Sequence, residues 1–86
     1  MPEQKIGVIT HYFGNIGVAA LEITDGELHV GDTIHIKGHT SDFTQTIDSM
    51  QVDGQPVQEA SLGQNVGLKT SEHAREHDAV FKVSDS

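Results

Sequence analysis

Cysteine is absent from this chain of 86 residues, and so is tryptophan. Without thiols the chain can form neither a disulfide nor a thiolate metal site, so packing has to hold the fold together. The sequence also has no run of roughly 20 apolar residues, the length that a membrane-spanning helix needs. The first residues, MPEQK, lack the basic start and apolar core of a secretory signal. We therefore expect a cytoplasmic protein that has no membrane segment.

Basic residues are scarce as well. Five Lys and Arg residues stand against 13 Asp and Glu residues, which gives a net charge of −8 with neutral histidines. The bases are scattered along the chain as Lys5, Lys37, Lys69, Arg75 and Lys82. A negative field repels phosphate backbones, whereas nucleic-acid-binding proteins usually show a basic stripe. The charge disfavours RNA as a partner without excluding it, because folding could gather some bases on one face.

The residues that are present form short runs rich in β-branched and aromatic side chains. We predict strands over residues 5–13, 16–24, 27–30, 33–37, 43–52, 64–69 and 79–83. Asp25-Gly26 and Asp53-Gly54 are hairpin signals, and Gly31-Asp32 indicates a further turn in which Asp32 can accept from backbone N–H groups. Residues 56–62 and 70–78 are predicted to be connections, and no helix longer than one turn is expected.

The apolar spacing within residues 43–52 departs from the period of two that a strand favours. Ile47 and Met50 lie three residues apart. We interpret this spacing as a β-bulge that would turn both side chains toward the core. Residues 1–86 are long enough for one domain, and we expect its core between about residues 5 and 83. Several short strands separated by turns predict a sandwich or barrel.

The order of the motifs resembles a known family. Residues 6–10 read IGVIT, residues 16–21 read IGVAAL, residues 26–38 read GELHVGDTIHIKG and residues 60–68 read ASLGQNVGL. This series is similar to the second domain of elongation factor Tu and its relatives. The resemblance implies an all-β fold, a small closed antiparallel barrel of about six strands. A related barrel is also found on some collagenase-like peptidases, and the chain could resemble that accessory barrel in detached form.

Catalytic equipment is not predicted. The P-loop motif G-x-x-x-x-G-K-[ST] does not occur in the sequence, which excludes nucleotide hydrolysis of the elongation-factor type. Residues 73–77 read HAREH and match the zinc-peptidase pattern H-x-x-E-H, but that pattern requires a helix. We interpret His73, Glu76 and His77 as a solvated loop, and His29, His35 and His39 as exposed polar residues. No catalytic, cofactor-binding or metal-ligating residue is assigned, and no cofactor is expected.

Aromatic residues offer the best candidates for contact with a partner. Phe43 and Phe81 are expected in the core, as is common for aromatic residues of a small barrel. Tyr12 and Phe13 are adjacent, so their side chains should point to opposite faces and one of them should be exposed. Tyr12 and Phe13 are therefore predicted to contact a partner. Lys37 is the third predicted contact residue.

The sequence favours a non-enzymatic binding module that contacts a protein or ribonucleoprotein, with an acidic surface suited to a basic partner. One alternative is a barrel that binds tRNA or rRNA directly and serves translation or RNA modification. A second alternative is a His-based metal-binding protein. The oligomeric state and the identity of the partner stay open.

Overall fold

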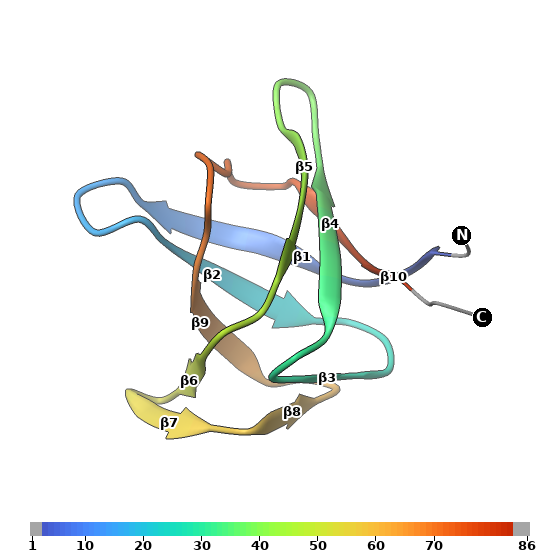
Figure 1. Ribbon diagram of the computed structural model, residues 1–86, viewed down its shortest axis with the longest axis vertical. Helices are drawn as coiled ribbons and strands as arrows, with labels where there is room; N and C mark the ends of the chain where they lie inside the picture. Colours follow the sequence, from blue (N-terminus) through green and yellow to red (C-terminus); the bar gives the residue numbers. More distant parts are fainter. Residues whose placement is uncertain (1–2, 84–86) are drawn as a thin grey trace.

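The computed structural model describes residues 3–83, which form ten β-strands (Figure 1). The strands are β1 (Glu3–Phe13), β2 (Val18–Ile23), β3 (Glu27–His29), β4 (Thr33–Lys37), β5 (Asp42–Thr46), β6 (Met50–Val52), β7 (Gln55–Val57), β8 (Glu59–Ser61), β9 (Asn65–Lys69) and β10 (Ala79–Val83). The described residues contain no helix that could span a membrane. The all-β class predicted from the sequence is confirmed.

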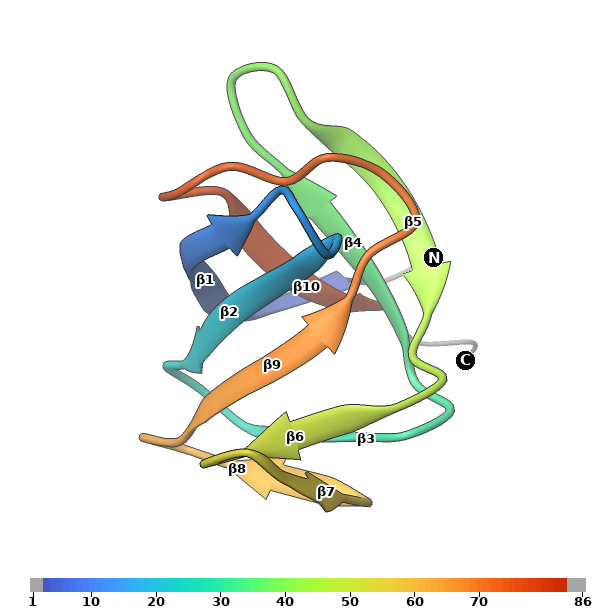
Figure 2. The same ribbon diagram turned by 90° about the vertical axis from the view of Figure 1, so that its left-hand side faces the viewer.

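Eight strands form one antiparallel sheet in the order β5-β4-β10-β1-β2-β9-β6-β7, and β3 pairs with β8 in a separate ribbon. The sheet curls around the core, and Figure 2 shows β2, β9 and β6 side by side along one wall. Its two edges, β5 and β7, do not pair with each other. The prediction of a closed barrel is therefore wrong: the sheet is open.

The ladder of strands does not close because the predicted strand 43–52 is interrupted in the structure. The structure divides it into β5, which is one edge of the sheet, and β6, which lies next to the other edge. Between them Ile47 leaves the sheet and bonds the turn before β4: its N–H donates to the Asp32 carbonyl, and its carbonyl accepts from the Gly31 N–H, both at 2.9 Å. The chain turns a corner here, so the bulge expected between Ile47 and Met50 does not form. Both side chains are nevertheless buried.

The connection predicted over residues 56–62 is also wrong, because it contains β7 and β8. Both strands have only three residues, and Pro56 lies in β7 at the edge of the sheet, where its missing N–H costs no ladder bond. The hairpin signal before it is confirmed. Asp53 and Gly54, with φ angles of 54° and 77°, join β6 to β7 as a two-residue turn with both residues in the left-handed region.

Turn chemistry near β4 also follows the sequence. Gly31 has a φ angle of 98°, a backbone conformation that side chains other than glycine rarely adopt. Asp32 Oδ2 accepts a hydrogen bond of 2.8 Å from the His29 N–H, as the sequence predicts. This bond fixes the turn between the small β3–β8 ribbon and the main sheet.

The core is almost entirely aliphatic. Its buried members come from the inward-facing positions of the strands together with two residues outside them, Ile47 and Ala74: Ile6, Ile9, Ala19, Leu21, Ile23, Leu28, Ile34, Ile36, Phe43, Ile47, Met50, Ala60, Val66, Leu68, Ala74 and Val80. Each large side chain buried in this way stabilises the fold by about 1.5–3 kcal/mol. The prediction for Phe43 is confirmed. That for Phe81 is wrong, because Val80 takes the inward position of β10 and leaves Phe81 on the outer face.

Candidate functional site

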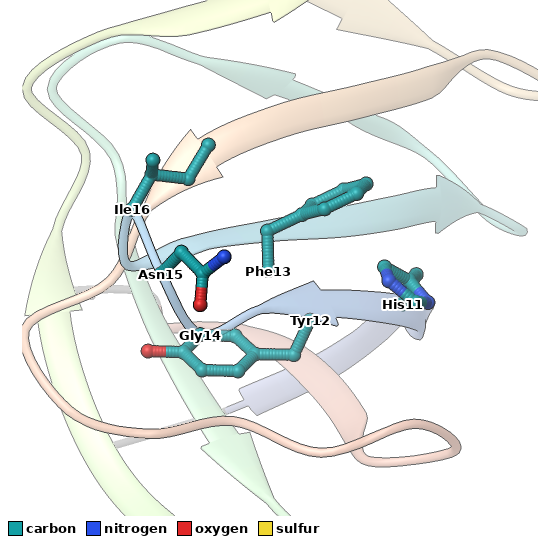
Figure 3. A pocket seen from close by; sticks show the side chains of 6 residues that line it. All are labelled: His11, Tyr12, Phe13, Gly14, Asn15 and Ile16. Atoms are coloured by element: carbon teal, nitrogen blue, oxygen red, sulfur yellow. The ribbon is translucent and has the colours of Figure 1, made fainter.

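The tip of the β1–β2 hairpin carries two of the three predicted contact residues. Residues 14–17 form its turn, in which the Phe13 carbonyl accepts from the N–H groups of Ile16 and Gly17 at 3.2 and 2.9 Å. The turn therefore holds Ile16 next to the end of β1. Figure 3 shows the side chains of Phe13 and Ile16 on one side of the hairpin and that of Tyr12 on the other.

Phe13 is the exposed member of the aromatic pair, as the alternation of strand side chains predicts. Its exposed fraction is 47%, and that of Ile16 is 61%. The His11 ring, two residues before Phe13 and on the same face, meets the Phe13 ring edge-on with centroids 4.4 Å apart. His11, Phe13 and Ile16 thus form an exposed patch, which we call the hairpin patch.

Tyr12 has the opposite role. It is half-buried and packs against the core, and its ring stacks on the His73 ring with centroids 4.4 Å apart. His11 Nδ1 also lies 3.6 Å from the Glu76 carboxylate. Two side chains of the loop 70–78 therefore contact the hairpin, and buried Ala74 anchors that loop in the core. The prediction that Tyr12 and Phe13 point to opposite faces is confirmed.

Two shallow hollows flank the hairpin. One, of about 340 Å³, is lined by residues 11–16 and includes the hairpin patch (Figure 3). The other, of about 210 Å³, is lined by His11, Tyr12 and residues 73–76. Because His11 and Tyr12 line both hollows, the hairpin and the loop form one continuous surface. Sequence reasoning missed His11 and Ile16, although the spacing of His11 and Phe13 indicated a shared face.

Lys37 does not belong to this surface. It is exposed on β4, opposite Asp42 of β5, and it lines neither hollow at the hairpin. The three predicted contact residues therefore do not form one site. Tyr12 and Phe13 share the hairpin tip, and Lys37 lies elsewhere.

The H-x-x-E-H sequence does not form a zinc-peptidase site. Residues 73–77 are not helical, so they lack the helix on which the zinc-peptidase pattern places its residues. His73 stacks on Tyr12 and Glu76 faces His11, whereas His77 has a φ angle of 74° and donates its backbone N–H to the Ile9 carbonyl at 2.7 Å. The loop interpretation from the sequence agrees with this conformation.

The histidines of the second predicted group lie apart in the structure. His29 Nε2 is 3.1 Å from the Glu59 carboxylate, and His35 contacts Glu3 and Asp42. In the part of the chain that the structure describes, the ligand atoms of Glu27, His29 and Glu59 lie within 4.8 Å of one another. The two carboxylates are exposed, and this arrangement is common on acidic surfaces that hold no metal. We assign no metal site to it.

The His35 contacts perturb two titrations. Hydrogen bonds to Asp42, the larger cause, and to Glu3 raise the pKa of His35 above its ordinary value of 6.5. The hydrogen bond between His35 and Asp42 also lowers the pKa of Asp42 below its ordinary value of 3.8. An ionised carboxylate on either side of the ring favours the imidazolium form.

Known proteins similar to this chain include two peptidases. The chain is 35% identical over 78 residues to a collagenase of Porphyromonas gingivalis, which matches 90% of the chain and 22% of the collagenase. It is 31% identical over 83 residues to an uncharacterized protease of Methanocaldococcus jannaschii, which matches 95% of the chain and 20% of the protease. The chain thus spans about a fifth of the length of these relatives. No protein-family model matches it.

Solved structures with the same fold also come from a protein assigned to the peptidases. The C-terminal domain of a Geobacillus thermoleovorans protein assigned to the U32 peptidases superposes with a TM-score of 0.87 and 20% identity, covering 94% of this chain and 93% of that one. Its selenomethionine variant gives a TM-score of 0.84, also at 20% identity, with 90% and 96% covered. At this identity the likeness establishes the fold.

These matches overturn the elongation-factor resemblance. The shared motifs are turn glycines and alternating apolar strands, which specify a curved antiparallel sheet and carry no function. The curated relatives are a collagenase and a protease, and the solved structures share the fold without being translation factors, so the prediction of a translation-factor-like binding module is wrong. Neither RNA binding nor His-based metal binding is better supported by these matches. The chain has the fold of the solved C-terminal domain.

Proposed function

We propose that this chain serves as the accessory C-terminal domain of a U32-type peptidase, and that the remainder of such a peptidase carries the cleavage site. The observation that supports this most directly is the match to the P. gingivalis collagenase, at 35% identity over 78 residues but only 22% of its length. The solved structure with the same fold is a C-terminal domain of a protein assigned to the U32 peptidases. The role is that of a domain working beside a catalytic one.

The chemistry of the hairpin surface agrees with a role in contact. Its titratable groups are solvated: the side chains of His11 and Glu76 are 54% and 58% exposed. Acid–base catalysts are usually desolvated and oriented so that their pKa suits the reaction. Exposed Phe13 and Ile16, in contrast, present the apolar area that a protein interface buries. We assign the hairpin patch to contact with the catalytic part of the peptidase.

The charge of the chain favours a basic contact surface on that partner. A net charge of −8 favours encounter with a basic protein surface and steers its approach, while the apolar contacts supply most of the affinity. Lys37 lies outside the hairpin patch and has no part in this interface.

A chimaeric collagenase tests the proposal. The matching segment of the P. gingivalis enzyme is replaced by this chain, and gelatin cleavage is compared with that of the parent and of a version that lacks the segment. We expect the chimaera to recover activity that the shortened version loses, and the isolated chain to cleave nothing.

Two outcomes would overturn it. A chimaera no more active than the shortened enzyme, with both folded by circular dichroism, would remove the accessory role. Gelatin cleavage by the isolated chain, purified without other proteases, would place the cleavage site here instead.

A further inference from the structure

A histidine on the outer face of the sheet lies between two carboxylates. His35 Nδ1 is 3.0 Å from Glu3 Oε2, and His35 Nε2 is 2.5 Å from Asp42 Oδ1. The His35 side chain is only 16% exposed, whereas those of Glu3 and Asp42 are 36% and 68% exposed. The ring is therefore fixed at the surface, and its partners reach it from both sides.

The protonation state follows from the contacts alone. A neutral imidazole has one N–H donor and one acceptor nitrogen, whereas an ionised carboxylate only accepts. With Glu3 on one ring nitrogen and Asp42 on the other, both contacts are hydrogen bonds only when the ring carries two protons. After loss of one proton, one carboxylate faces a nitrogen lone pair and its contact becomes repulsive.

The three residues belong to three strands of the sheet. Glu3 belongs to β1, His35 to β4 and Asp42 to β5, and β10 lies between β1 and β4. The His35 ring crosses β10 beside the Phe81 ring, with centroids 6.1 Å apart. β5 is an edge of the sheet, so β4 is its one neighbouring strand in the ladder that the structure describes. The contacts of His35 therefore join this edge strand to the interior of the sheet.

The charged groups around the ring are few. From β1, Glu3 and Lys5 share its face; from β4, Lys37; and from β5, Asp42. The face of β10 that meets the ring contributes Phe81 and no charge. In this neighbourhood His35 is the group whose charge changes near neutral pH.

We propose that His35, held between Glu3 and Asp42, acts as a pH-dependent clamp on the edge strand β5. The doubly protonated ring fixes β5 to β4 and β1, and loss of a proton releases one arm. The strand then opens more often, while the rest of the sheet keeps its pairing. This gives the domain an edge whose local stability responds to pH, independently of the role proposed for the hairpin patch.

Amide hydrogen exchange tests the clamp. Protection factors, corrected for the intrinsic pH dependence of exchange, are measured by NMR at about pH 5.5 and about pH 8.5, on either side of the ordinary histidine pKa. The N–H groups of Phe43 and Gln45, which face β4 in the ladder, report on β5, and Leu21 and Val66 in the centre of the sheet serve as references. Protection in β5 should fall by about twofold to fivefold at the higher pH, the range that exposed ion pairs reach, with little change at the references.

Substitutions separate the clamp from a general effect of pH. His35→Gln should abolish the pH dependence in β5, and His39→Gln, which removes an exposed histidine from the β4–β5 turn, should preserve it. If His35→Gln does not fold, Asp42→Asn removes one carboxylate while leaving the ring in place, and should reduce the dependence. Equal protection of β5 at both pH values, or an unchanged dependence in the folded variants, would overturn the proposal.

Discussion

The side chain of Gln45 in β5 links the edge of the sheet to the end of β9. Its Nε2 donates to the Lys69 carbonyl at 2.8 Å, and its Oε1 accepts from the Ser71 N–H at 2.7 Å. One amide side chain thus makes the pair of bonds that a neighbouring strand would make. It satisfies backbone groups that the open sheet leaves without a ladder partner.

This link predicts the effect of truncating Gln45. Gln45→Ala should lower the free energy of unfolding by about 1–2 kcal/mol, since each hydrogen bond contributes about 0.5–1.5 kcal/mol net. Urea denaturation followed by circular dichroism measures the change. Gln51→Ala, at an exposed position of β6, is the matched control and should stay within about 0.5 kcal/mol of the parent. Equal effects of the two substitutions would show that the link does not stabilise the sheet.

A second prediction concerns Gly7 in β1. A Cβ atom added there would collide with the Glu22 carbonyl oxygen and come within 2.6 Å of Leu21 Cδ1, so neighbouring β2 would have to move. Gly7→Ala should therefore destabilise the fold by about 1–3 kcal/mol.

Gly14 provides the comparison for Gly7. A Cβ atom there would meet only Tyr12 Cε2, at 3.8 Å, which is ordinary contact. Gly14→Ala should leave the midpoint of thermal unfolding almost unchanged, while Gly7→Ala lowers it by several degrees. If Gly7→Ala unfolds at the temperature of the parent, β1 and β2 are less tightly apposed than the structure has them.

The glycines show what the sequence could and could not predict. Turn positions such as Gly31 and Gly54 follow from local patterns, because a positive φ angle is a property of a few adjacent residues. Close approach between strands depends on register, which no local pattern contains. Gly7 is tightly enclosed by Glu22 and Leu21, whereas a Cβ atom added at Gly67 would meet only Val18 Cγ1, at 3.9 Å.

The same limit applies to the sheet and to the site. Period-two patterns predicted the long strands, but they could not show that Ile47 turns a corner or that residues 55–57 form an edge strand, because both depend on distant partners. Alternation placed Tyr12 and Phe13 on opposite faces correctly. The contact of His73 with Tyr12 joins segments about 60 residues apart, so only the folded chain reveals it.

A third prediction is the pH dependence of stability. The raised pKa of His35 adds stability that is fully present below its unfolded-state value of 6.5 and is lost as the pH rises through the folded-state pKa. The lowered pKa of Asp42 adds stability that is present above its unfolded-state value of 3.8 and is lost as the pH falls through the folded-state pKa. The contribution of the pair is therefore greatest between these two limits.

Thermal unfolding across this range measures the effect. As the pH rises and His35 loses its proton, the parent should lose stability relative to His35→Gln. The loss should be modest because the carboxylates are exposed. Asp42→Asn should reduce the change on both the acid and the alkaline side. Parallel curves for the parent and His35→Gln over the whole range would contradict the perturbed titration of His35.

The last prediction concerns the hairpin patch, for which the chain contains a matched control. Leu62, in the turn between β8 and β9, is 64% exposed, similar to Ile16 at 61% and Phe13 at 47%. Exposed apolar residues outside an interface contribute little, whereas those buried at the centre of one cost about 1 kcal/mol or more when truncated. In the collagenase chimaera, Phe13→Ser with Ile16→Ser should reduce gelatin cleavage about fivefold or more, and Leu62→Ser should leave it unchanged. All three positions are exposed, so the isolated variants should unfold at nearly the temperature of the parent. An equal loss of cleavage from Leu62→Ser would show that the hairpin patch has no special part in the interface, and a loss confined to the hairpin variant, with stability retained, is what direct contact requires.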